Sequence, residues 1–160
     1  MKKQAIVIAS IVLLATAGIV MYNSPAATGM TVVVYKNPGC VCCSNWADKM
    51  REAGFTVEVH ESPIMSQIKA EHGVAPGLAS CHTALVDGYV IEGHVPPADV
   101  IRLLAEKPAI LGLAVPGMPV GSPGMEMGSP ADYHAYDIVA FDGAGRTSVY
   151  RSVSGGINTR

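Results

Sequence analysis

The segment from 31 to 43 reads TVVVYKNPGCVCC and joins a strand pattern directly to a cluster of cysteines. Residues 31–35 are β-branched or apolar throughout, which is typical of a buried strand. Asn37-Pro38-Gly39 ends that strand. From 42 to 53 apolar residues recur at helical spacing, and Gly54 follows as a helix stop. The segment therefore predicts a strand and then a helix, with the cysteines at the N-terminus of the helix.

Further strands and helices are predicted along the rest of the chain. Apolar and polar residues alternate from Phe55 to Val59, which predicts a second strand. Asp87-Gly88 between two apolar runs is typical of a two-residue hairpin turn. The other predicted elements are a short helix from Ser62-Pro63 to Gly73 that carries Ile64 and Ile68, hairpin strands over 83–86 and 89–91, a helix over 97–107, and a terminal hairpin of 136–141 and 147–153.

The order of these elements, β-α-β-α-β-β-α, resembles the thioredoxin fold. The first crossover predicts two parallel strands, and the Asp87-Gly88 hairpin predicts an antiparallel pair. We therefore expect an α/β, thioredoxin-like fold with a Met/Gly/Pro-rich loop over 111–135 and a C-terminal β-hairpin. The cysteines follow the carboxyl end of the first strand, where open α/β sheets place their functional residues.

The first residues have the pattern of an export signal. Lys2 and Lys3 precede an uncharged apolar run from 5 to 21, and small residues follow at 23–27. We expect 1–27 to be a signal peptide; an uncleaved anchor is the alternative, because the run reaches the short end of a membrane-spanning length. The expected parts are then a metal-binding domain over 28–110, the loop, and a hairpin and tail over 136–160 packed on the same domain. This organisation predicts a periplasmic protein with no membrane contact beyond the leader.

Charge argues against nucleic acid as a partner. Without Lys2 and Lys3, 9 basic residues remain against 13 acidic ones, which gives a net charge of −4. The sequence has no cluster of lysine and arginine that would bind a phosphate backbone.

The cysteines are the main functional signal. Three of the four, Cys40, Cys42 and Cys43, lie within four residues, and Cys81 is the fourth. Cys40 and Cys43 form a Cys-x-x-Cys pair at a helix N-terminus, where the helix dipole favours thiolates. Both disulfide exchange and metal binding use such thiolates. Two ordinary structural disulfides are disfavoured, because Cys42 and Cys43 are adjacent and a local disulfide that involves Cys42 would be cramped.

Cys42 favours the metal-binding interpretation. A third thiol offers a competing partner during disulfide exchange, whereas it adds a ligand to a metal site. Successive side chains in the first helical turn point about 100° apart, so one ion is poorly gripped by Cys42 and Cys43 together. The spacing favours several ions bridged by sulfur atoms.

Other soft or imidazole ligands lie near the predicted site. His82 follows Cys81 at the slot where thioredoxin-like proteins usually have a cis-proline. Met118, Met125 and Met127 lie in a near-repeat, PGMPVGS at 116–122 and PGMEMGS at 123–129. Thioethers select Cu(I) and imidazole also binds copper, so His82 and the three methionines are candidate further ligands. The alternative for the methionines is packing over the core. His94 and His134 lie in predicted loops and are weaker candidates, and His60 and His72 are expected at the surface.

Four motifs in order resemble the CopG-type copper-resistance proteins, an exported family long described as a domain of unknown function. They are CVCC at 40–43, SCHT at 80–83, GYVIEGHVP at 88–96, and GLAVPGMP at 112–119 followed by GSPGME at 121–126. The resemblance implies a thioredoxin-like fold, a periplasmic location, and a cluster of Cu(I) ions held by Cys40, Cys42, Cys43 and Cys81. It also implies a role in copper tolerance beside copper efflux or chaperone proteins.

The sequence thus predicts a Cu(I)-binding protein that buffers, carries or redox-processes copper, with several ions per chain. Oxidation of Cys40 and Cys43 to a disulfide is expected to expel copper. One rival is a thiol–disulfide oxidoreductase with Cys40 as attacking thiol and Cys43 as resolving thiol, so the chain is either a metal-binding protein or a thiol/copper oxidoreductase. A lesser rival is a zinc site with Cys₃His or Cys₄ ligands.

Overall fold

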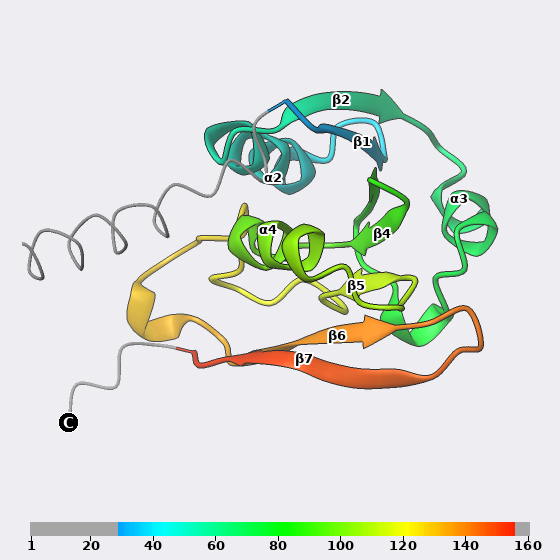
Figure 1. The fold of residues 1–160 in the computed structure, drawn as a ribbon. Coiled ribbons are helices and arrows are strands. Elements are labelled where there is room, and N and C mark those ends of the chain that lie inside the picture. The colour runs from blue at the N-terminus through cyan, green and yellow to red at the C-terminus, as the bar shows by residue number, and fades with distance from the viewer. Residues whose placement is uncertain (1–28, 156–160) are drawn as a thin grey trace, which may run out of the picture.

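A computed structural model describes residues 29–155, which form one mixed sheet with helices on both sides (Figure 1). The predicted leader lies outside the described residues. The strands are β1 (Thr31–Lys36), β2 (Thr56–Glu61), β3 (His82–Val86), β4 (Tyr89–Glu92), β5 (Gly112–Ala114), β6 (Tyr136–Phe141) and β7 (Thr147–Val153). The helices are α2 (Val41–Glu52), α3 (Met65–Glu71) and α4 (Pro97–Glu106), with 3₁₀ turns η1 (Pro76–Leu78) and η2 (Pro130–Asp132).

The seven strands lie in the order β2-β1-β3-β4-β5-β6-β7. β1 and β2 are parallel, as the first crossover predicts, and β3 is antiparallel to both β1 and β4. Asp87 and Gly88 have φ angles of 46° and 83°, which a two-residue turn of the mirror-image type requires. The predicted mixed α/β sheet is confirmed.

Strand β5 was not predicted, because the whole of 111–135 was expected to be loop. It pairs in parallel with β4 and antiparallel with β6, so it attaches the terminal hairpin to the rest of the sheet. A Cβ at Gly112 would collide with the Val90 carbonyl. A three-residue strand that starts with glycine has no periodic pattern of its own, and only its two neighbours make it a strand.

The main core lies between the sheet and the two helices α2 and α4, which Figure 1 shows on one side of the sheet, with α3 on the other. Trp46 and Met50 of α2 pack there with Val100 and Leu103 of α4, and all four are fully buried. The opposite face carries a smaller cluster of Val74, Leu78, Val90, Ala114 and Phe141. Met65 of α3 is also buried.

The strand predicted over 55–59 is present as β2, an edge strand in which Val59 is exposed. One local prediction needs correction. Ile64 was placed on the helix, yet it caps α3 and is 51% exposed, while Met65 is buried. α3 begins at Met65, so Ile64 lies before its first turn and outside the face that packs on the sheet.

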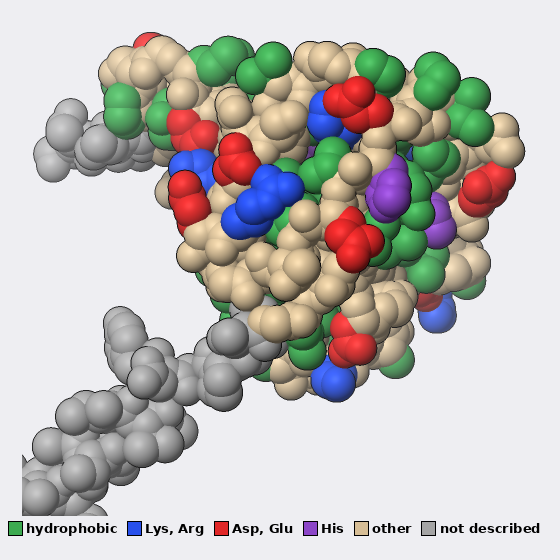
Figure 2. All heavy atoms as spheres, turned by 90° about the horizontal axis from the view of Figure 1, so that it is seen from above, with side chains coloured by type: hydrophobic (Ala, Val, Ile, Leu, Met, Phe, Trp, Pro, Cys, Tyr) green, Lys and Arg blue, Asp and Glu red, His purple; other side chains and the backbone are tan. Residues whose placement is uncertain are grey.

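Over residues 29–155, no helix has the length and apolar character that crossing a membrane requires. On the face shown in Figure 2, Lys and Arg side chains lie among Asp and Glu and form no basic patch.

Candidate metal centre

Helix α2 places three cysteines at its N-terminus, directly after β1. Gly39 adopts a φ of 73°, which turns the chain, and Cys40 occupies the N-cap position without a side-chain cap. The Ser44 N–H donates to the Cys40 carbonyl and begins the helix. The free N–H groups of the first turn make this a place where thiolates are stabilised.

The four predicted cysteine ligands converge, with Sγ atoms that all lie within 4.8 Å of one another. Cys40 and Cys43 are joined by a disulfide across a Cα–Cα distance of 5.4 Å. Cys42 and Cys81 are free thiols. The Cys42 Sγ lies 3.6 Å from the Cys40 Sγ and 3.9 Å from the Cys81 Sγ, so it contacts sulfur on both sides.

Cys81 reaches this cluster because it precedes β3, next to β1 in the sheet. In the β3–β4 hairpin Thr83 is paired with Glu92, and the Gly93 N–H donates to the His82 carbonyl at 2.9 Å. His82 therefore lies opposite Gly93, and the next pair in the same register is Cys81 opposite His94.

Two histidines adjoin the Cys81 sulfur, and both are fully buried. The Cys81 Sγ lies 3.3 Å from His82 Nδ1 and 2.9 Å from His94 Nε2. The sequence predicts His82 as a candidate ligand and His94 as a weaker candidate. The hairpin itself carried the missing signal, because a two-residue turn at Asp87-Gly88 fixes which residues face each other along both strands.

Burial sets the protonation of this group. It lowers the pKa of His82 well below 6.5, with a further contribution from His94 and Lys69, and it lowers the pKa of His94. Burial also raises the pKa of the Cys81 thiol to about 12, with the Cys42 sulfur adding to the effect. Both imidazoles are therefore neutral near pH 7, which is the form that binds metals.

A buried carboxylate fixes the backbone beside Cys81. Glu92 accepts hydrogen bonds from the Ser80 N–H at 2.6 Å and from the Thr83 hydroxyl at 2.7 Å. The Lys69 ammonium lies 2.6 Å from the same carboxylate and neutralises it. The residues before and after Cys81-His82 are thus held by one side chain.

The Met/Gly/Pro-rich loop over 111–135, called the Met-rich loop below, packs across the start of α2. The Gly124 N–H donates to the side chain of Glu126, which also pairs with Lys49 of α2 at 3.3 Å. A Cβ on Gly124 would lie 2.8 Å from the Cys42 carbonyl oxygen. The loop therefore covers one side of the cysteine cluster.

The three candidate methionines have different environments. Met125 is buried, while Met118 and Met127 are 54% and 56% exposed. A parallel bridge pairs Ser80 with Gly117, so Met118 follows the residue that lies beside Ser80. His60 is exposed and His72 is half-buried, and both stack on Tyr35, away from the cysteines.

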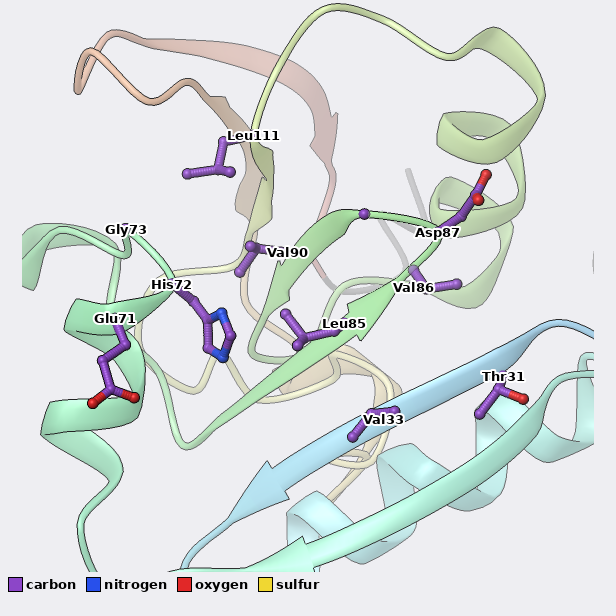
Figure 3. A pocket seen from close by; sticks show the side chains of 11 residues that line it. Thr31, Val33, Glu71, His72, Gly73, Leu85, Val86, Asp87, Val90 and Leu111 are labelled. Carbon is purple, nitrogen blue, oxygen red and sulfur yellow. The ribbon is translucent and has the colours of Figure 1, made fainter.

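A cavity of about 620 Å³ lies elsewhere, between α3 and the sheet (Figure 3). Val33, Leu85, Val90 and Leu111 line it, with His72 and Glu71 at its side. It includes no cysteine, so it is separate from the sulfur cluster.

Solved structures of copper resistance protein CopG have the same fold. The Form 2 structure is 40% identical, with a TM-score of 0.74, and the match covers 78% of this chain and 98% of that one. For Form 1 the identity is 41%, the TM-score 0.74, and the coverage 79% and 98%. The chain belongs to the CopG-type copper-resistance family.

The family model described as "Protein of unknown function, DUF411" matches residues 78–125. In this CopG-type chain, the matched segment runs from the Cys81 loop through His94 to Met125. The search of curated proteins gives no match. Family membership and the converging cysteines together fit copper binding.

Proposed function

We propose that this chain is a periplasmic Cu(I)-binding protein that holds a multinuclear copper–thiolate cluster and acts in copper resistance. The observation that carries the proposal is the convergence of Cys40, Cys42, Cys43 and Cys81, which come from segments 39 residues apart. Soft thiolates prefer Cu(I) over harder ions. Copper is the cargo, and copper efflux or chaperone proteins are its expected partners.

The residues present suit a soft metal. The Cys42 sulfur lies between two others at contact distance, which is where a bridging thiolate would be required. His82 is fully buried and its Nδ1 lies 3.3 Å from the Cys81 sulfur, so this nitrogen is placed to bind an ion that the sulfur holds. We include His82, Met118, Met125 and Met127 as further candidate ligands. The leader and the family support export to the periplasm.

We also infer that β1 to α4 form a thioredoxin-like unit. The order β2-β1-β3-β4 with β3 antiparallel to its neighbours supports this, as does the position of Cys40 and Cys43 at the start of α2. We expect a metal-binding domain over 28–110 that is completed by the loop 111–135 and the hairpin and tail 136–160.

The Cys40–Cys43 disulfide links copper binding to redox state. Two-electron oxidation of this pair by a partner disulfide forms one S–S bond in the chain, and the partner leaves as a dithiol. Both thiolates are then lost as ligands, so copper is released. Copper content measured before and after selective oxidation tests this step, and unchanged copper would contradict it.

The test of the cluster is an anaerobic titration of the reduced protein with Cu(I) against a competing chelator. We expect several ions per chain, and we expect Cys42→Ser to lose them. Asn45→Ser is the matched control, since it changes an exposed residue of the same helix and leaves all thiols in place. One ion or none in the unsubstituted protein would overturn the cluster.

The disulfide favours one second function, a thiol–disulfide oxidoreductase with Cys40 and Cys43 as the exchanging pair. Cys42→Ser separates the two: disulfide exchange with a model protein substrate should survive it, whereas cluster binding should not. A zinc site with Cys₃His or Cys₄ ligands is the lesser alternative, and tight one-to-one zinc binding by the reduced protein without copper preference would support it.

A further inference from the structure

A second group of ligand atoms shares only Cys81 with the four-cysteine cluster. The donor atoms of Cys81, His82 and His94 all lie within 4.8 Å of one another. The two rings meet edge to face, with centroids 5.1 Å apart. This group combines one thiol with two imidazoles, and it is present in the state in which Cys40 and Cys43 are bonded to each other.

The surroundings of His94 fix which nitrogen is free. His94 Nδ1 lies 2.8 Å from the Pro123 carbonyl oxygen. Because a carbonyl only accepts hydrogen bonds, Nδ1 carries the proton and donates it. The other nitrogen, Nε2, then presents its lone pair toward the Cys81 sulfur at 2.9 Å. A second partner that fixes the tautomer in this way is typical of metal-binding histidines.

His82 contributes a buried imidazole that is positioned by packing. Its ring lies 4.5 Å from that of Trp46, and its Nδ1 lies 3.3 Å from the Cys81 Sγ. Nδ1 is therefore the nitrogen that an ion bound at this sulfur would contact, and the proton of the neutral ring then lies on Nε2, which is buried without a hydrogen-bond partner among residues 29–155.

Disulfide formation changes the ligands that remain. With Cys40 and Cys43 joined, the free thiols are Cys42 and Cys81, whose sulfurs are 3.9 Å apart. Two thiols and two imidazoles are a Cys₂His₂ set, which suits a tetrahedral Zn(II) ion, while a Cu(I) cluster needs more bridging sulfur. We propose that the disulfide form of this chain binds one Zn(II) ion through Cys81, His82 and His94, with Cys42 as the adjacent fourth donor.

This site goes beyond copper binding and does not depend on it. It uses His94, which the four-cysteine cluster does not need, and it exists in the oxidised state, whereas the zinc alternative with Cys₃His or Cys₄ requires the reduced one. Binding involves no electron transfer: the ion replaces the thiol protons of Cys81 and Cys42, which pass to the buffer.

The test uses the full chain with the Cys40–Cys43 disulfide intact, verified by a count of two free thiols after unfolding. Co(II) serves as the optical probe for Zn(II). We expect one Co(II) per chain, a thiolate-to-cobalt charge-transfer band, the intense d–d bands of a tetrahedral site, and displacement by Zn(II). Absence of binding, or a spectrum without the thiolate band, would overturn the site.

Variants assign the ligands. His94→Gln should weaken Co(II) binding at least about tenfold. Removing a residue that only hydrogen-bonds to a metal ligand already lowers metal affinity by about that factor, and loss of a ligand should cost no less. His72→Gln is the matched control, because His72 is a half-buried histidine outside the group. Cys81→Ser, a nearly isosteric change, should weaken the charge-transfer band, because Cys42 is then the only thiolate donor left; the assignment therefore does not rest on one variant. Unchanged binding in His94→Gln would refute the assignment.

The two proposals fail separately. If the oxidised chain binds no Co(II) while the reduced chain still loads several Cu(I) ions, only the zinc site is wrong. If the oxidised chain binds Co(II) through His94 while the reduced chain takes no Cu(I), the copper cluster is wrong and the zinc site stands.

Discussion

The carboxylate of Glu92 is fully buried and lies 2.6 Å from the ammonium of Lys69, beside the loop that carries Cys81. Removing one partner of a buried ion pair leaves an uncompensated charge, at a cost of about 3–5 kcal/mol. We expect Lys69→Met to reduce the free energy of unfolding by an amount of this order in urea titrations. Arg102→Met removes one partner of the exposed Arg102–Glu106 pair and should have a much smaller effect, because solvent screens this pair. Equal effects would mean that the buried pair has no special role.

The same carboxylate should hold Cys81 in place. Glu92→Gln keeps the shape of the side chain but replaces one carboxylate oxygen by an amide NH₂ group. This group cannot accept the hydrogen bond from Ser80 or Thr83 that the oxygen accepts. We expect faster alkylation of Cys81 in the disulfide form of this variant, followed by mass spectrometry. An alkylation rate equal to that of the unsubstituted protein would show that the loop keeps its position without Glu92.

The single tryptophan should report on metal binding. Trp46 donates from Nε1 to the Val95 carbonyl at 2.8 Å, and its ring lies 4.5 Å from that of His82. Co(II) bound at His82 gives the excited indole a nonradiative path through its d–d and charge-transfer states, so fluorescence should fall in proportion to the Co(II) bound. Emission that stays constant up to full loading would place the ion away from His82.

Alanine substitutions at two glycines of the Met-rich loop distinguish the cost of lost close packing from the cost of backbone strain. Gly124 and Gly128 both have positive φ angles, of 85° and 78°, but only at Gly124 would a Cβ press on α2, at 2.8 Å from the Cys42 carbonyl oxygen. Gly128→Ala should cost about 1–2 kcal/mol through strain alone. Gly124→Ala should cost about 1–3 kcal/mol more, because the loop must move off the helix. Unfolding in urea measures both variants, and equal losses would show that the loop yields freely.

Acid should destabilise the metal-free protein through its buried histidines. Burial lowers the pKa of His82 well below 6.5, so the ring stays neutral in the folded state while the unfolded chain binds a proton. Stability is therefore full above pH 6.5 and falls as the pH drops below it, by up to about 1.4 kcal/mol per pH unit for this group. Unfolding free energies at pH 7 and pH 5 measure the fall, and His82→Gln should reduce it.

His134 provides the control for this measurement. It is exposed in the loop before β6, and His134→Gln leaves the buried imidazoles in place. The acid-induced fall should therefore persist in this variant. If His82→Gln and His134→Gln behave alike, the fall comes from other groups.

Thiol reactivity should follow the raised pKa of Cys81. Burial, followed by the nearby Cys42 sulfur, raises this pKa to about 12. In the disulfide form, alkylation of Cys81 should therefore rise about tenfold per pH unit from pH 8 to 10, since the thiolate is the nucleophile. Cys42→Ser removes the second cause and should accelerate the reaction at each pH, as measured by mass spectrometry. A rate that levels off near pH 8 would contradict the raised pKa.

The sequence alone determined the elements whose signals are local. The β-branched run at 31–35, the Asp87-Gly88 turn and the terminal strands at 136–141 and 147–153 each carry their pattern within a few residues, and each lies where it was predicted. The position of the thiols at the start of α2 was also predictable, because the cysteines stand between the strand pattern and the helical pattern in the sequence. The family motifs also lie in the sequence, and the structures of relatives confirm the family.

Only the tertiary structure decided what depends on contacts between distant segments. It paired β5 with β4 and β6, buried Met125 while leaving Met118 and Met127 exposed, and made β2 an exposed edge. It also brought His94 to within 2.9 Å of the Cys81 sulfur and oriented its ring through the Pro123 carbonyl. Side-chain burial and ring orientation are set by neighbours from other segments of the chain, so a local pattern does not encode them.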